Sequence, residues 1–371
     1  MTQTVCLNMI VKDEAPVIRR CLESVRPLID TWVIVDTGST DGTQDVIRDV
    51  YRDLPGELYE RPWKGYDGSR TEAIELARDR ADFLFFIDAD DVMEMEPGFR
   101  MPELTRDAYR VDIHSGDIVY WRPVLVSTRL PWRYVGVLHE YVECGRPFSL
   151  GTLEGARMVI VGGGGRHRNE GVRDKYLRDV KILEDGLAKE PGNARYAYYL
   201  AQSWRDAGEP ERAIEAYDRR AAMGGWNEEI YCAHLWAARL SETLDRPPAE
   251  VMDRYLRAHE TLPSRAEALA DLARWCRVKG QRWPLAYMYA RQAVRIPYPT
   301  DGLLVETGWY DWQALDELAV SAFWVGEYEE SASCCERLLE GGKLPDEHRE
   351  RVTENLRFAR QRLSPRELAE V

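Results

Sequence analysis

Short apolar runs and amphipathic segments alternate along the first part of the chain. The run VCLNMIV begins at Val5, WVIVD begins at Trp32 and FLFFID begins at Phe83, as is typical of strands buried on both faces. Segments between these runs, such as APVIRRCLESV and DGTQDVIRDVY, place apolar residues at helical spacing. This βαβαβαβ order predicts an α/β domain with a Rossmann-like parallel sheet covered by helices on both faces.

The pattern changes twice further along the chain. After Asp91 come the strand-like segments AYRVDIH, IVYWRPVLV and YVGVLHEYVEC, which contain no helical spacing and predict a mixed extension of the sheet. Beyond about Arg173 the chain becomes helical and rich in alanine. We therefore expect an α/β domain over residues 1–172 and an all-α domain over residues 173–371.

The helical part contains degenerate repeats. In ARYAYYLAQSWRDAGEPERAIEAYDRRAA, Leu200, Ala201 and Trp204 precede Ala213 and Tyr217 at the spacing of a tetratricopeptide repeat. The segment LDELAVSAFWVGEYEESASCCERLL repeats this pattern loosely, and ALADLARWCRVKG with PLAYMYARQAV gives a third pair with one inserted residue. The second domain is therefore predicted to be a stack of tetratricopeptide-like helix pairs.

Composition narrows the function mainly by exclusion. The chain has 371 residues, 44% of them hydrophobic and 31% charged, which is ordinary for a soluble protein of two domains. We find no apolar run of about 18 residues for a transmembrane helix, and no secretory signal in MTQTVCLNMIVKDEA. A net charge of −14 argues against nucleic acid as a partner. Seven cysteines without CxxC spacing suit the reducing cytoplasm better than a disulfide framework or a zinc site.

Charged residues gather where the predicted strands end. They are Lys12, Asp13, Glu14, Asp36, Glu60, Arg61, Asp88, Asp90 and Asp91. Ligands of a doubly wound sheet bind beyond the carboxyl ends of its strands, so we expect a binding site there. No GxGxxG follows the first strand, and carboxylate oxygens favour Mg²⁺ or Mn²⁺ over Zn²⁺. Taken alone, FLFFIDADD leaves open the alternative that its carboxylates cap a helix or face water.

The nonapeptide VDTGSTDGT is more specific. Asp36 ends a strand, Gly38 permits a tight turn, and Ser39 to Asp41 can cap the next helix, although an ordinary strand–turn–helix connection would look similar. Together with MIVKDEAPVIRRCLESV, FFIDADD and a later carboxylate-bearing strand, it resembles the family 2 glycosyltransferases of the GT-A fold over roughly residues 4–170. With the repeats, the chain resembles the subgroup of bacterial peptide and protein glycosyltransferases, including those that glycosylate bacteriocin cysteines.

The resemblance implies a nucleotide site. Asp36, with Lys12 and Glu14, would contact the nucleobase, which is most often uracil in this family. Arg70 in SRTEA matches a motif near the nucleotide, whereas Thr71 stands where asparagine is usual.

The resemblance also implies a metal site. Asp88 and Asp90 match the DxD motif, with Asp88 near the ribose and Asp90 on the metal. His167 in GGGGRHRNEG matches a late histidine that completes metal coordination in many GT-A enzymes. The four glycines would form a flap over the diphosphate or a linker to the repeats, and the two roles are compatible.

Inverting sugar transfer needs a base for the acceptor proton and a Lewis acid for the departing diphosphate. Glu140 in GVLHEYVE, at the end of a strand-like run in the sheet extension, matches the His-Glu pair of related domains and is implied to be the base. The alternative is that Glu140 is a surface strand residue. Asp91 is the second candidate for the base, and His139 is expected to orient groups or face the acceptor.

These expectations describe a cytoplasmic, Mn²⁺- or Mg²⁺-dependent inverting hexosyltransferase whose donor is a nucleotide-sugar, with a UDP-sugar favoured. The repeats would hold a peptide or protein acceptor, or mediate homo-oligomerisation. One alternative acceptor is a lipid-linked or cell-envelope glycan. A second alternative is a non-catalytic repeat scaffold with a degenerate transferase domain. The sequence leaves the sugar and the acceptor atom open.

Overall fold

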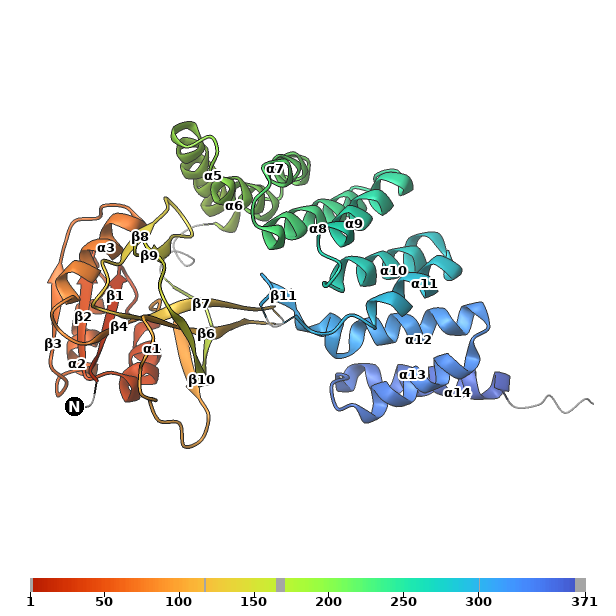
Figure 1. Ribbon diagram of the computed structural model, residues 1–371, viewed down its shortest axis with the longest axis horizontal. Helices are drawn as coiled ribbons and strands as arrows, with labels where there is room; N and C mark the ends of the chain where they lie inside the picture. Colours follow the sequence, from red (N-terminus) through yellow and green to blue (C-terminus); the bar gives the residue numbers. More distant parts are fainter. Residues whose placement is uncertain (1–2, 117, 165–170, 300, 364–371) are drawn as a thin grey trace, which may run out of the picture. The chain divides into compact units, whose positions relative to one another are not determined.

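The computed structural model describes residues 3–116, 118–164, 171–299 and 301–363 (Figure 1). The chain divides into two compact units, Met1–Glu209 and Pro210–Val371. Within the described ranges no helix is long and apolar enough to cross a lipid bilayer.

The first unit begins with alternating strands and helices and continues with strands. Its elements are β1 (Val5–Val11), α1 (Ile18–Val25), η1 (Arg26–Leu28), β2 (Thr31–Asp36), α2 (Thr43–Val50), β3 (Gly56–Glu60), α3 (Tyr66–Ala77), β4 (Phe83–Phe86), β5 (Asp91–Met95), β6 (Ala108–Ser115), β7 (Ile118–Ser127), β8 (Arg133–Val135), β9 (Tyr141–Glu143), β10 (Leu150–Ile160), α5 (Val172–Lys189) and α6 (Ala194–Asp206). The predicted α/β fold with a mixed extension of the sheet is confirmed.

The main sheet has the strand order β3-β2-β1-β4-β7-β6-β10-β5 (Figure 1). Strands β3, β2, β1 and β4 are parallel, whereas β7 is antiparallel to both β4 and β6. Val11 of β1 stands beside Asp36 of β2, which in turn stands beside Glu60 of β3. The carboxyl ends of these parallel strands therefore meet at one edge of the sheet, as the doubly wound order predicts.

Each face of the sheet has its own apolar core. Leu7 of β1 packs in a cluster with Leu22 of α1, whereas the adjacent Cys6 belongs to a second cluster with Ile74 and Ala77 of α3. Neighbouring residues of a strand point to opposite faces, so the continuous apolar run of β1 is buried on both sides. Helices on both faces hold the strand ends in place.

The segment YVGVLHEYVEC departs from its predicted place in the extended sheet. Strands β8 and β9 instead pair with each other in a separate two-stranded sheet, and residues 136–140 form the loop between them. Gly136 has φ +123° and His139 has φ +51°, and backbone in this left-handed region cannot continue a strand. Glu140 therefore lies on a loop, and its predicted place at the end of a sheet strand is wrong.

The second unit is helical. It contains α7 (Pro210–Ala222), α8 (Asn227–Thr243), α9 (Pro248–Thr261), α10 (Glu267–Gly280), α11 (Trp283–Ala293), β11 (Val305–Glu306), η2 (Trp309–Gln313), α12 (Ala314–Val325), α13 (Tyr328–Glu340) and α14 (Asp346–Leu363). The helix pairs α10–α11 and α12–α13 correspond to two of the predicted repeats, and Tyr217, Tyr231 and Tyr255 are fully buried between helices. The tetratricopeptide-like architecture is confirmed. Because α5 and α6 belong to the first unit, that unit extends beyond residue 172.

Candidate functional site

Two turns at the carboxyl edge of the sheet are tied together by hydrogen bonds. The turn after β1 donates from the Asp13 amide to Ser39 Oγ (2.9 Å) and from the Glu14 amide to Thr43 Oγ1 (2.8 Å). In the opposite direction, the Thr40 amide donates to Asp13 Oδ1 (2.8 Å). The predicted site residue Glu14 therefore lies on a turn that is fixed to the loop after β2.

Asp36 is fully buried at the end of β2. Its Oδ1 accepts hydrogen bonds from the amides of Gly38 and Ser39, both at 2.7 Å. Among the described residues, its buried Oδ2 has no hydrogen-bond partner. A buried acceptor without a donor is destabilising, which makes this oxygen a candidate acceptor for the N–H of a ligand. Lys12 is exposed on the neighbouring turn.

Arginine side chains join the carboxylates that follow β4 to the loop after β8. Arg70 of α3 forms ion pairs with Asp88 and with Glu140, where Nε lies 2.5 Å from Oε1. Arg122 of β7 donates to the other oxygen of Asp88 at 3.1 Å and lies 4.0 Å from Asp91. The structure therefore brings the predicted residues Arg70, Asp88, Asp91 and Glu140 into one cluster.

The two arginines affect the carboxylates unequally. Burial opposes ionisation of Asp88, but Arg70 and Arg122 outweigh it and hold the pKa of this carboxyl well below its usual range. Burial, with the charge of Asp88 next, raises the pKa of Asp91 to about 8. A pKa raised in this way favours the protonated, neutral form of Asp91 near pH 7, whereas Asp88 stays ionised.

The fit of a metal ion depends on Asp90 and its neighbours. Oδ2 of Asp90 accepts a hydrogen bond from the Gly164 amide (3.1 Å), and Asp91 lies beside it at the start of β5. His167 lies outside the described residues. Within the described residues, no group of three or more His, Cys, Asp or Glu side chains could hold a metal ion. Mg²⁺ commonly binds through one or two carboxylates with water and substrate phosphates, and the carboxylates present fit that mode.

Two arginines of the site escaped the sequence interpretation. Arg122 is a charged residue inside the apolar run IVYWRPVLV, which is a usable signal for a functional side chain. Arg20 of α1 donates to the carbonyl oxygens of Asp90 (3.0 Å) and Gly162, and it thereby links the loops after β4 and β10. The helical pattern of α1 contains no signal for this role.

Thr71, which replaces the usual asparagine, has a structural partner. Its hydroxyl accepts a hydrogen bond from the Tyr134 amide at 3.0 Å and so attaches α3 to β8. The adjacent Arg70 lies over the Tyr134 ring, with 5.4 Å from its guanidinium carbon to the ring centre. By attaching α3 to β8, Thr71 thus helps to hold Arg70 in its place over Tyr134.

Comparison with known proteins shows what the two parts of the chain resemble. Residues 6–101 match the family model described as "Glycosyl transferase family 2". The chain is 23% identical over 228 residues to the "SPbeta prophage-derived glycosyltransferase SunS" of Bacillus subtilis (strain 168), which covers 58% of this chain and 52% of that protein. It is 27% identical over 312 residues to the "TPR repeat-containing protein Synpcc7942_0270" of Synechococcus elongatus. That match covers 78% of this chain and 75% of the other protein.

A third relative matches a shorter region. The "Lipopolysaccharide core biosynthesis glycosyltransferase LpsC" of Rhizobium meliloti (strain 1021) is 33% identical over 119 residues, covering 32% of this chain and 38% of that protein. The chain spans about half the length of the first of these relatives.

Proposed function

The N-terminal part of this chain is a family 2 glycosyltransferase domain, followed by tetratricopeptide-like repeats, and from this we propose that the protein transfers a sugar from a nucleotide-sugar to an acceptor. We further propose a UDP-sugar as donor and a peptide or protein side chain as acceptor. The observation that carries the proposal is the ion-pair cluster in which Arg70 joins Asp88 to Glu140. Through Arg70, Glu140 belongs to the same cluster as the carboxylates that follow β4, and we propose that Glu140 faces the acceptor.

In this proposal the edge of the sheet binds the donor. The unpartnered Oδ2 of Asp36 accepts a base N–H, with Lys12 and Glu14 on the adjacent turn as further contacts. Asp88, held by Arg70 and Arg122, accepts from the ribose hydroxyls. These are directional polar contacts, which orient a nucleotide as well as bind it.

The reaction is a single displacement at the anomeric carbon. The bond from that carbon to the diphosphate oxygen breaks, and its electron pair leaves with the diphosphate. A bond forms from the acceptor oxygen or sulfur to the same carbon, and configuration inverts. The acceptor proton passes to Glu140, of which one oxygen is held by Arg70 while the second accepts the proton. Asp91 is the second candidate for this role, although only 4% of its side chain is exposed.

Asp90 would hold Mg²⁺ or Mn²⁺, with Asp88 and His167 as the other proposed ligands and Asp91 beside them. When bound, such an ion supplies Lewis-acid stabilisation of charge on the diphosphate. The chain's own contribution is to keep the donor oriented through Asp36 and Asp88.

The proposed acceptor and compartment rest on the repeats, the relatives and the cysteines. The tetratricopeptide-like repeats favour a peptide or protein acceptor, whether the repeats bind that acceptor or assemble copies of the chain. The match to a lipopolysaccharide core glycosyltransferase favours an envelope glycan as the second candidate. Seven free, buried cysteines support a reducing compartment, the cytoplasm.

The proposal is tested by incubating the protein with a panel of nucleotide-sugars and Mn²⁺ and measuring nucleotide release and melting temperature. We expect one UDP-sugar to raise the melting temperature and to be hydrolysed slowly. If no nucleotide-sugar binds or is hydrolysed, the transferase domain is degenerate and the protein is a repeat scaffold. If a nucleotide other than UDP is released, the protein is a glycosyltransferase with a different donor from the one proposed.

A further inference from the structure

The loop that carries Glu140 has a strained backbone. His139 adopts φ +51°, a conformation that residues other than glycine rarely adopt. Gly136 has φ +123°, and a Cβ at this position would lie 3.3 Å from the Glu140 Cα, so the loop folds back tightly on itself. Strands β8 and β9 have three residues each and provide little support. Strained conformations persist when surrounding contacts enforce them.

Helix α6 supplies contacts to the residue before Glu140. Arg195 donates two hydrogen bonds to the His139 carbonyl oxygen, from Nη2 at 2.8 Å and from Nε at 3.1 Å. The Tyr199 ring stacks on the His139 ring with centroids 3.8 Å apart and planes 7° apart. Both the backbone and the side chain of His139 are thus held by α6.

The guanidinium of Arg195 is itself held between aromatic rings. Its central carbon lies 5.1 Å from the centre of the Tyr141 ring, beyond Glu140, and 4.9 Å from the centre of the Tyr199 ring. Such cation–π contacts restrict the arginine to one orientation. Arg195 therefore connects the residues on both sides of Glu140.

The start of the loop packs against the helix pair formed by α5 and α6. The buried Tyr196 accepts a hydrogen bond from the Val137 amide at 3.3 Å. Gly186 of α5 makes room for this contact, since a Cβ there would lie 3.2 Å from both the Tyr196 ring and the Val137 side chain. The helix pair and the loop thus share one closely packed interface.

We infer that Arg195, Tyr196 and Tyr199 of α6 are positioning residues that hold Glu140 in place for proton transfer. The inference rests on the proposed function, because it takes Glu140 as the base. It assigns α5 and α6 a part in the catalytic site, although both are helices that follow the last strand of the first unit.

The test compares Arg195→Ala with Arg205→Ala, which is a matched change on the same helix where the arginine pairs with Asp206 at 2.7 Å. Each full-length variant is assayed for UDP release, with water as acceptor, from whichever of UDP-glucose, UDP-galactose or UDP-N-acetylglucosamine the parent protein hydrolyses fastest. We expect Arg195→Ala to lower kcat by about 10- to 100-fold, as a misplaced base would. The donor KM and the calorimetric affinity for UDP with Mn²⁺ should stay near those of Arg205→Ala.

A second comparison separates positioning from general stability. If Arg195 acts through Glu140, adding Arg195→Ala to Glu140→Gln should lower kcat little further, since coupled residues are not additive. Arg195→Lys, which keeps one donor for the His139 carbonyl, should recover part of the rate. Full additivity in the double variant, or unchanged kcat in Arg195→Ala, would overturn the inference.

The controls keep this inference distinct from the proposed function. An inactive parent protein contradicts the proposed function itself, whereas an active Glu140→Gln moves the base to Asp91 and overturns this inference, which takes Glu140 as the base. An active parent with an inactive Glu140→Gln and a normal Arg195→Ala contradicts the role of α6 alone. If Arg195→Ala does not fold, Tyr199→Ala is assayed in the same way, and normal kcat in that variant would equally overturn the inference.

Discussion

The two units each contain a cluster of charged side chains, and the two clusters differ in how deeply those side chains are buried and in how far apart in the sequence the paired residues lie. In the first unit, the cluster of Asp88, Asp90, Asp91 and Glu140 contains two arginines, and Asp91 has a pKa raised to about 8 by burial and by Asp88. The side chains of Arg70 and Glu140 are only 16% and 10% exposed, and these paired residues lie 70 positions apart in the sequence.

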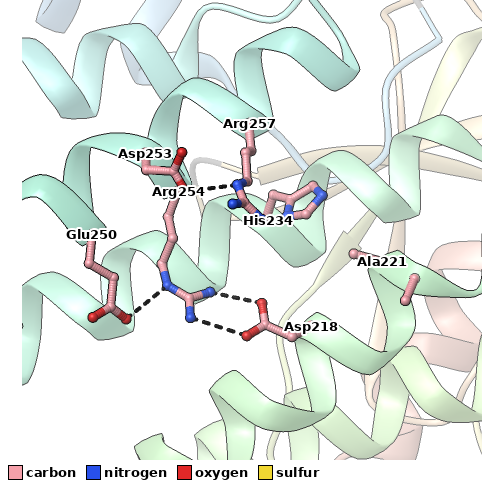
Figure 2. Close-up of a pocket in the computed structure, with 8 residues that line it drawn as sticks. Asp218, Ala221, His234, Glu250, Asp253, Arg254 and Arg257 are labelled. Atoms are coloured by element: carbon pink, nitrogen blue, oxygen red, sulfur yellow. Dashed lines mark hydrogen bonds and ion pairs between the residues drawn. The ribbon is translucent and has the colours of Figure 1, made fainter.

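In the second unit, a cavity of about 580 Å³ lies between α7, α8 and α9 (Figure 2). Figure 2 shows Arg254 between two carboxylates, paired with Asp218 through both guanidinium NH groups (2.8 and 3.1 Å) and with Glu250 at 3.3 Å. Arg257 pairs with Asp253 at 2.8 Å. Burial lowers the pKa of the neighbouring His234, which favours its neutral form.

The contrast teaches that charge density alone does not mark a ligand site. Pairs such as Arg254–Glu250 link positions one helical turn apart and stabilise the helices that carry them. The pairs of the first cluster instead join separate elements in a largely buried site, where charges are screened less by solvent and salt. We therefore expect changes in the first cluster to alter activity and changes around the second cavity to alter stability slightly.

The largest expected effect is that of Glu140→Gln. The amide keeps the shape and hydrogen bonding of the carboxylate but cannot accept a proton, so transfer to a hydroxyl should fall by ~10²–10⁴. A thiol acceptor, partly ionised near neutral pH, should lose less. Steady-state kinetics with the two acceptor types measures the difference. Near-normal turnover on a hydroxyl would move the role to Asp91.

The next effect concerns the metal. Asp90→Ala and His167→Ala should each weaken Mn²⁺-dependent UDP binding by ~1–3 kcal/mol, roughly five- to 150-fold, because each removes one metal ligand. Titration calorimetry with and without Mn²⁺ measures this. The metal assignment fails if both variants bind UDP as the parent protein does.

A smaller effect is expected from removing the second unit. A chain ending at Glu209 keeps the donor site and α6, so UDP affinity and the slow hydrolysis of donor should change little. A chain ending at residue 190 lacks the contacts of Arg195 and Tyr199 to His139, and its hydrolysis should be slower. Melting curves with UDP and Mn²⁺ first establish that each chain folds. Equal hydrolysis by both chains would argue against a role for α6.

The smallest effect is expected at the second cavity. Arg254→Ala removes pairs in which Asp218 is nearly half exposed, and solvent screening limits their contribution, so we expect a loss of about 0.5–1 kcal/mol in unfolding free energy. UDP release should not change. Denaturant unfolding and the hydrolysis assay measure the two quantities. A large loss of activity in Arg254→Ala would mean that this cavity also serves the reaction, and the contrast between the two units would fail.

The sequence by itself determined most of the helices and strands, and their order determined where the parallel strands end. Apolar runs such as Val5–Val11 and the helical spacing of the repeats are local patterns, and they predicted both fold classes. Parallel pairing then requires the strand ends to meet, so the sequence placed Asp36 and Asp88 at one edge.

Tertiary structure decided which charges pair across that edge. Arg70 and Glu140 are 70 residues apart, and Arg195 contacts the carbonyl of a residue 56 positions earlier. Periodicity reports the environment of a residue along its own strand or helix, whereas these contacts depend on how separate elements pack. The left-handed backbone at His139 likewise depends on such packing, because its stacking and hydrogen-bond partners lie on α6.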